Sequence, residues 1–174
     1  MKDNFKLENW LRGEVEGVPD LLQPAAHALL QTREEAIKYL QGFHESLLWE
    51  KPAGRASVAF HLQHIAGVTN RLITYSKGEQ LCKDQLEVLA KEGIFDERIT
   101  VLDLLANLKK AVDEAIKYLM GLQDLDLLEK VEIGRKKVPS TQIGVLFHAA
   151  EHSQRHIGQM LVTISVLKNE FLKG

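Results

Sequence analysis

Three histidines recur at four-residue spacing near the C-terminal end of the sequence, in the stretch HAAEHSQRH. They are His148, His152 and His156. Residues four apart lie on one face of an α-helix, so two of these imidazoles can reach the same point in space. Neutral imidazole is the commonest protein ligand of zinc, nickel and similar ions. The spacing therefore indicates a metal site, and the plainer alternatives are a polar helix edge or the lining of a pocket.

A second pair of histidines, His61 and His64, lies on another predicted helix, so five of the seven histidines fall in two segments. On a helix of 3.6 residues per turn, both sets lie along inward or boundary faces. Two histidines from one helix and a third from a facing helix leave one position of an ion open, as in catalytic zinc sites. Because such ligands are neutral, the ion keeps its full charge and strongly acidifies a bound water or thiol.

Several other kinds of site are excluded by the residues that they need. The HExxH signature of zinc proteases is absent, and no Glu-x-x-His pair recurs on two helices as in di-iron bundles. No serine or cysteine forms an obvious nucleophilic triad with the histidines. Cys82 is the only cysteine, which excludes an intramolecular disulfide and a cysteine-ligated zinc site.

The composition is that of one soluble globular domain. The chain has 174 residues, of which 45% are hydrophobic and 26% charged, and its formal net charge is −2. No basic block supports nucleic-acid binding. No apolar run approaches the ~18–20 residues of a membrane span, and the polar start MKDNFKLENW has no signal pattern. We therefore expect a cytoplasmic protein without a nucleic-acid or membrane partner.

Apolar residues with a period of 3.6 predict an all-α four-helix bundle. The long helices are expected at about 23–42, 57–77, 100–121 and 141–171, with a shorter helix at 80–92 in the long connection between the second and third. Ser57, Thr100 and either Ser140 or Thr141 are suitable N-caps for three of them. The weakly alternating stretch 129–139 is either a small hairpin or an extended loop.

Residues 1–22 are predicted to form an N-terminal extension that packs on the bundle domain of residues 23–174. Glycines and a proline interrupt any long helix in this segment. The apolar side chains available to anchor it are Trp10, Leu11, Leu21 and Leu22.

Two stretches of the sequence together carry a resemblance to a known family. They are LWEKPAGRASVAFHLQHIAGVTNRLITY, at residues 48–75, and HAAEHSQRHIGQM about eighty residues later. They contain a tryptophan–proline loop, a serine that opens a helix, a histidine followed by small residues, and the pattern H-x-x-x-H-x-G-Q. In this order and spacing the chain resembles the DinB/YfiT-like metalloenzyme family over about residues 24–170.

The resemblance implies a DinB-like four-helix bundle in which three histidines bind one divalent ion, zinc or nickel. The residues that match the ligand positions are His64, His152 and His156. His61 and His148 exceed the family pattern, so His61 in place of His64, or a pair of His148 with His152, remain alternatives.

Three further residues are candidates for supporting roles near this site. Arg71 lies two turns from His64 on the same face and can hold a carboxylate of a thiol or substrate, or pair with a glutamate at the surface. Gln159 is a candidate for orienting a ligand histidine, and Gly158 for allowing a close helix approach. No catalytic residue is assigned.

The family members with assigned reactions imply a function. They include low-molecular-weight thiol S-transferases and a thiol-dependent isomerase, so we expect a metal-dependent transferase with a thiol cosubstrate and a small-molecule substrate. A metal-dependent hydrolase that uses bound water, and a non-catalytic helical dimer, are the alternatives. The family is often dimeric, and apolar residues outside the core stripes, such as Phe95 and Phe171, also favour a homodimer.

Overall fold

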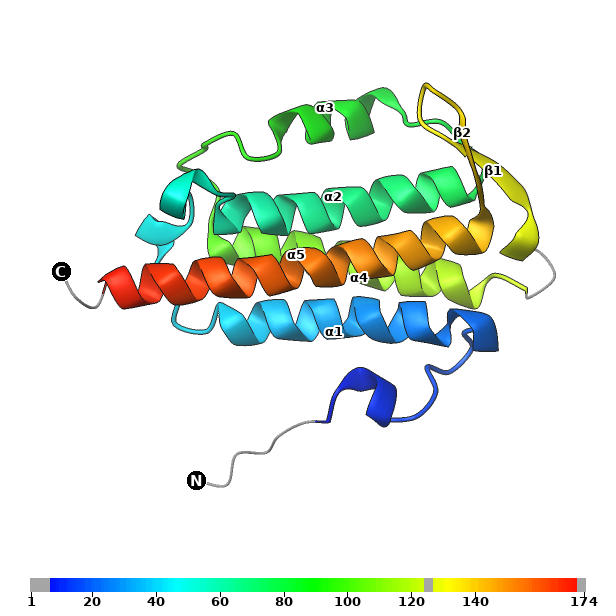
Figure 1. The fold of residues 1–174 in the computed structure, drawn as a ribbon, viewed down its shortest axis with the longest axis horizontal. Coiled ribbons are helices and arrows are strands. Elements are labelled where there is room, and N and C mark those ends of the chain that lie inside the picture. Colours follow the sequence, from blue (N-terminus) through cyan, green and yellow to red (C-terminus); the bar gives the residue numbers. More distant parts are fainter. Residues whose placement is uncertain (1–6, 124–126, 172–174) are drawn as a thin grey trace.

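Four long helices lie side by side and form the body of the molecule (Figure 1). They are α1 (Gln23–Tyr39), α2 (Val58–Ser76), α4 (Val101–Met120) and α5 (Gln142–Phe171). The computed structural model describes residues 7–123 and 127–171 of the chain. The predicted all-α four-helix bundle is confirmed.

The N-termini of three long helices are capped by the residues that the sequence indicated. Ser57 Oγ accepts a hydrogen bond from a backbone N–H of the first turn of α2 at 3.2 Å. Thr100 Oγ1 accepts one from the backbone N–H of Asp103, whose carboxylate accepts one from the Thr100 N–H in return. Thr141 Oγ1 accepts one from the first turn of α5 at 3.1 Å. These bonds satisfy N–H groups that have no partner inside the helix.

The end of α1 differs from the prediction. The helix ends at Tyr39 and not near residue 42. The chain leaves it in a tight turn in which Gly42 has a φ of +66°, a value outside the helical region.

The long connection between α2 and α4 follows from the direction of these two helices. The colours of Figure 1 show that α2 and α4 run in the same direction, so the chain must return along the bundle between them. The return contains the short helix α3 (Lys83–Lys91), which lies along the outer side of α2 in this view.

None of the residues of α3 is buried, so apolar packing contributes little to its position. Polar contacts hold it against α2. The Gln85 side-chain amide donates to Asn70 Oδ1 and to Thr74 Oγ1, both at 2.7 Å. Just after α3, the backbone N–H of Gly93 donates to Gln63 Oε1 at 2.8 Å.

A β-hairpin closes one end of the bundle. Its strands β1 (Lys130–Ile133) and β2 (Val138–Thr141) pair antiparallel. The hairpin is therefore the correct alternative for this stretch. Apolar residues of the hairpin, α2 and α5 form a small cluster there, which includes Val131, Leu72 and Val145.

Two 3₁₀ turns, Asn9–Leu11 and Asp20–Leu22, lead into α1. Leu22 is buried in the core, and the Asn9 carboxamide donates to Gln31 of α1 at 3.0 Å. Because only one side of a short turn faces the bundle, the other predicted anchors are wrong: Trp10, Leu11 and Leu21 are exposed.

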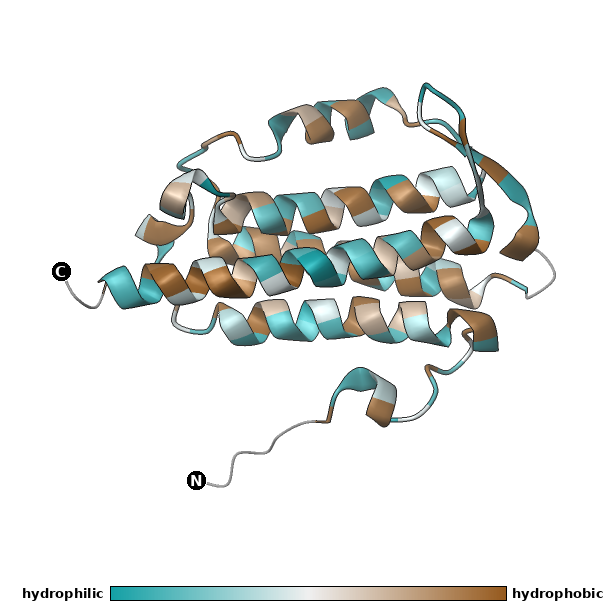
Figure 2. Cartoon of the chain, viewed as in Figure 1, coloured by the Kyte–Doolittle hydropathy of each residue, from teal (hydrophilic) through white to brown (hydrophobic). Residues whose placement is uncertain are grey.

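The main core lies between the four long helices, where apolar side chains from each of them meet. It includes Leu29, Leu62, Leu108 and Met160, each 2% exposed or less. Figure 2 shows a run of hydrophilic residues along the middle of α5, between hydrophobic stretches. Among the residues that the structure describes, no helix combines the length and apolar character needed to cross a bilayer.

Gly93 determines how the chain leaves α3, and replacing it tests that role. Gly93 and Gly78 have φ values of +77° and +73°, but only at Gly93 would a β-carbon meet Phe60, at 3.0 Å from Cδ2. We expect Gly78→Ala to lower the free energy of unfolding by about 1 kcal/mol through backbone strain. Gly93→Ala should lower it by roughly 2 kcal/mol, because Phe60 must also move. Urea denaturation followed by circular dichroism measures both, and equal losses would contradict the role of Phe60.

Candidate metal centre

Three imidazoles meet between α2 and α5. His64 comes from α2, and His152 and His156 come from successive turns of α5. One ring nitrogen from each lies within 4.8 Å of the other two, and all three residues are partly buried. The Nε2 atoms of His64 and His152 are 3.0 Å apart. The tertiary structure thus brings together the three residues that match the family ligand positions, and their role as ligands stays a prediction.

The meeting of these side chains depends on the close packing of α2 on α5. Thr69 and Ser153 lie at this interface, are fully buried, and have hydroxyl oxygens 3.4 Å apart. Because both side chains are small, the helices approach closely enough for longer side chains at the edge of the interface to touch. His152 and His156, one turn apart, have ring centroids separated by 4.6 Å.

A carboxylate that the sequence did not reveal lies behind His64. Glu92, in the loop after α3, places Oε2 2.7 Å from Nδ1 of His64 and Oε1 2.6 Å from Nη1 of Arg71. The Glu92 and Arg71 side chains are only 5% and 6% exposed. The pair lies directly on Gly67, where an added β-carbon would overlap the carboxylate and the guanidinium.

The Glu92 carboxylate determines which nitrogen of His64 carries a hydrogen. An ionised carboxylate only accepts hydrogen bonds, so Nδ1 of His64 donates to it. In the neutral ring this leaves the lone pair on Nε2, which faces His152. A carboxylate behind a ligating histidine commonly orients the ring and increases its basicity as a metal ligand.

His61 occupies a comparable position behind His156. It is 2% exposed, and its Nδ1 lies 3.0 Å from Nδ1 of His156. This contact uses Nδ1 of His156 and leaves Nε2 as its remaining nitrogen. His61 does not belong to the group of three converging nitrogens.

Burial keeps most of these rings neutral. Burial, together with the smaller effect of nearby His64, lowers the pKa of His61 to about 4. Burial and the neighbouring histidines, His64 first, lower the pKa of His156 to about 3. The pKa of His152 is also lowered, again mainly by burial. At neutral pH these imidazoles therefore have the uncharged form that binds a metal ion.

The residues present fit a divalent ion of intermediate softness. The donor set is imidazole nitrogen, which suits zinc and nickel. Two ligands of a tetrahedral zinc ion, each at ~2.0–2.1 Å, would be about 3.3 Å apart, close to the 3.0 Å between Nε2 of His64 and Nε2 of His152. Within the described residues the buried Nδ1 of His152 has no hydrogen-bond partner, so they leave one polar atom of the cluster unsatisfied.

The remaining candidates lie outside the converging group. His148 is exposed, with Nδ1 3.5 Å from a carboxylate oxygen of Glu151. Gln159 is exposed, and within the described residues it makes no hydrogen bond to a histidine. The role suggested for Gly158 is wrong, because a β-carbon there would meet nothing within 4 Å. Arg71 is paired with a glutamate, but in a buried position beside the site and not at the surface.

Glu92 is the residue of this site that sequence reasoning missed. It lies 28 residues from His64, outside every motif that we recognised. Neither its helical neighbours nor its spacing distinguishes it from the other glutamates of the chain. The only sequence feature related to Glu92 was the run of small residues after His64, where Gly67 provides the space for the carboxylate.

Comparisons with known proteins agree with this architecture. The model of the DinB superfamily matches residues 28–160. A crystal structure of a Streptococcus pneumoniae protein from a structural genomics consortium has a TM-score of 0.59 and 16% sequence identity, and the match covers 87% of this chain and 91% of that one. At this identity the likeness shows the fold alone. No curated protein matches the sequence. Because the family model covers well over half of the residues, the chain belongs to the DinB superfamily.

Proposed function

We propose that this protein is a divalent-metal-dependent enzyme whose ion is bound by His64, His152 and His156. The observation that carries the proposal is the convergence of three imidazole nitrogens within 4.8 Å. Three protein ligands leave one position for a small molecule, as in catalytic zinc sites. Membership of the DinB superfamily, which is often metal-binding, gives independent support.

The chemistry that we propose is transfer of a low-molecular-weight thiol to a small-molecule electrophile. A bound divalent ion lowers the pKa of a thiol, which is normally ~8.5, so that the nucleophilic thiolate is present at neutral pH. In the transfer, the thiol gives up its proton to solvent, and its sulfur forms a bond to an electrophilic carbon of the substrate as the bond from that carbon to the leaving group breaks and the leaving group departs with the electron pair. The three histidines would suit an ion that binds thiol or one that binds water equally well. The choice of thiol as the nucleophile is therefore supported by the family resemblance.

The residues around the histidines orient the rings and shield them from water. Glu92 holds the hydrogen on Nδ1 of His64, and His61 contacts Nδ1 of His156. Phe60 stacks on the His64 ring, with centroids 5.2 Å apart and planes inclined by 10°. An apolar ring at this position lowers the local dielectric constant, which strengthens the effect of an ion on a bound group.

A homodimer remains a proposal. Phe95 and Phe171 are 67% and 51% exposed. Each already contacts a ring of its own chain: Phe95 meets Trp49 edge to face, and Phe171 lies tilted against His44, so their exposure alone identifies no interface.

The ligand set is tested by replacing two histidines of α5, eight residues apart, with alanine. His156→Ala should remove most of the metal that copurifies with an untagged protein, since two ligands would remain. His148→Ala should leave the metal content nearly unchanged, because His148 lies outside the converging group. Atomic emission of the dialysed proteins measures the metal-to-protein ratio. Full metal in the first variant and loss in the second would identify His148 and His152 as the pair, and absence of metal from the unsubstituted protein would overturn the proposal.

The role of Glu92 is tested through the affinity of the site for zinc. Glu92→Ala removes the partner of His64, and Gly67→Ala displaces the carboxylate without changing a histidine. We expect each to weaken binding by about 10–100-fold. Gly158→Ala is the matched control, another helical glycine with open space around it, and it should bind zinc normally. Competition with a chromophoric chelator gives the affinities, and an unchanged affinity in Glu92→Ala would contradict a positioning role.

Thiol chemistry is separated from water chemistry with the cobalt-substituted protein. Adding 2-mercaptoethanol should produce a near-ultraviolet charge-transfer band from a thiolate–cobalt bond, with an apparent thiol pKa below ~8.5. Ethylene glycol, which has hydroxyl groups only, should leave the spectrum unchanged. A spectrum that responds to neither compound would reject thiol binding and favour the hydrolase alternative.

A further inference from the structure

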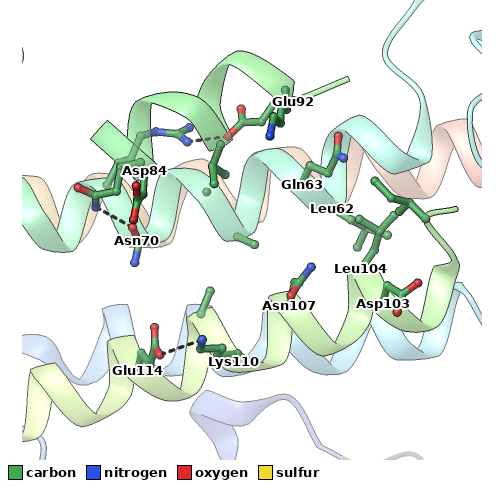
Figure 3. A pocket seen from close by; sticks show the side chains of 18 residues that line it. Leu62, Gln63, Asn70, Asp84, Glu92, Asp103, Leu104, Asn107, Lys110 and Glu114 are labelled. Atoms are coloured by element: carbon green, nitrogen blue, oxygen red, sulfur yellow. Dashed lines mark hydrogen bonds and ion pairs between the residues drawn. The ribbon is translucent and has the colours of Figure 1, made fainter. Parts of the chain in front are cut away.

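A hollow of about 530 Å³ lies between α2, α3 and α4, separate from the three converging histidines (Figure 3). Its volume is within the range of small-molecule sites. Arg71 and Glu92 line it, and through Glu92 it shares a wall with the histidine cluster. Apolar side chains contributed by α2 and α4 also line it, including Leu62, Ala66 and Ala111.

Residues that line this hollow carry unused hydrogen-bond donors. The Arg71 guanidinium has five N–H donors, and within the described residues only Nη1 has a partner, Glu92. Asn70 Oδ1 accepts from Gln85, and among the residues that the structure describes the Asn70 amide nitrogen makes no hydrogen bond. Figure 3 shows the side chains of Asn70 and Asn107 reaching from α2 and α4 toward the space between these helices.

Most of the lining carboxylates, by contrast, are already engaged. Glu92 pairs with Arg71, and Glu114 lies 3.9 Å from the Lys110 ammonium. Asp103 accepts a hydrogen bond from Thr100 at 2.6 Å.

Two further lining charges, Asp84 and Lys91, have opposite signs. Arg71, Lys91, Asn70 and Asn107 thus retain hydrogen-bond donors beside an apolar floor, while three of the four lining carboxylates already have a partner. This combination favours a ligand with a carboxylate, which accepts several hydrogen bonds, and an apolar body.

We propose that the hollow binds a small organic carboxylate, with its oxygen atoms held by Arg71 and Asn70 and its apolar body on Leu62, Ala66 and Ala111. The site needs no metal ion. It is distinct from the open ligand position of the histidine cluster.

Hexanoate and hexanol are the probes, because they share an apolar chain and differ in the carboxylate. Saturation-transfer NMR on chelator-treated protein should show hexanoate binding with a dissociation constant of about 1 mM. Hexanol should bind at least tenfold more weakly, because hydrogen bonds to a charged group are lost. Repeating the titration with zinc-loaded protein separates binding at an ion from binding in the hollow. Equal binding of hexanol, or no binding of hexanoate, would overturn the proposal.

Two leucine substitutions locate the binding. Ala66→Leu fills the hollow and should weaken hexanoate binding at least tenfold, whereas Ala106→Leu, exposed on α4 outside the hollow, should leave it unchanged. Asn70→Asp replaces the donating amide with a carboxylate that still accepts from Gln85, and it should weaken hexanoate binding about fivefold. Circular dichroism and zinc content should be normal in all three, so failure here is distinguishable from failure of the metal proposal. Full binding by Ala66→Leu would place hexanoate elsewhere and reject the site.

Discussion

The buried carboxylate of Glu92 is the interaction on which the arrangement of the site depends. An ionised carboxylate away from water is costly unless it is paired and hydrogen-bonded. Glu92 has two partners from α2, the Arg71 guanidinium and the His64 imidazole. Both are accessible only because residue 67 has no side chain. The same contact also holds the C-terminal end of α3, a helix that buries none of its own residues.

This single ion pair divides the surroundings of α2 into two environments. On one side, His64 faces the histidines of α5, where small buried side chains allow the two helices to approach. On the other side lies the hollow beneath α3, whose wall includes Arg71 and Glu92. A change in the position of Glu92 therefore reaches both environments, because its two oxygen atoms bond to different residues.

The likeness to the Streptococcus pneumoniae structure concerns the course of the helices and not the chemistry. At 16% identity, the Streptococcus pneumoniae protein and this chain share a bundle over nearly their whole lengths. A bundle of this kind positions side chains along the edges between its helices, and the reaction depends on which side chains occur there. In this chain the α2–α5 edge carries imidazoles with polar partners behind two of them, His64 and His156.

Local sequence determined the helices and the spacing of the histidines. Amphipathic periodicity and the caps at Ser57 and Thr100 act over a few residues, so the sequence alone predicts where α2 and α4 begin. The four-residue interval between His152 and His156 likewise sets their separation once a helix forms. The family resemblance identified His64 as the third candidate ligand. Its approach to His152 and His156 requires the packing of α2 on α5.

The tertiary structure alone decided what lies behind the ligand candidates. Glu92 reaches His64 across 28 residues, and His61 meets His156 across 95. Neither contact leaves a periodic pattern, because each depends on the register of separate elements. The exposure of Gly158, and of three of the four expected N-terminal anchors, was also decided by packing. Sequence patterns report which residues share a face of one element, whereas the contacts between faces are set by how the elements pack.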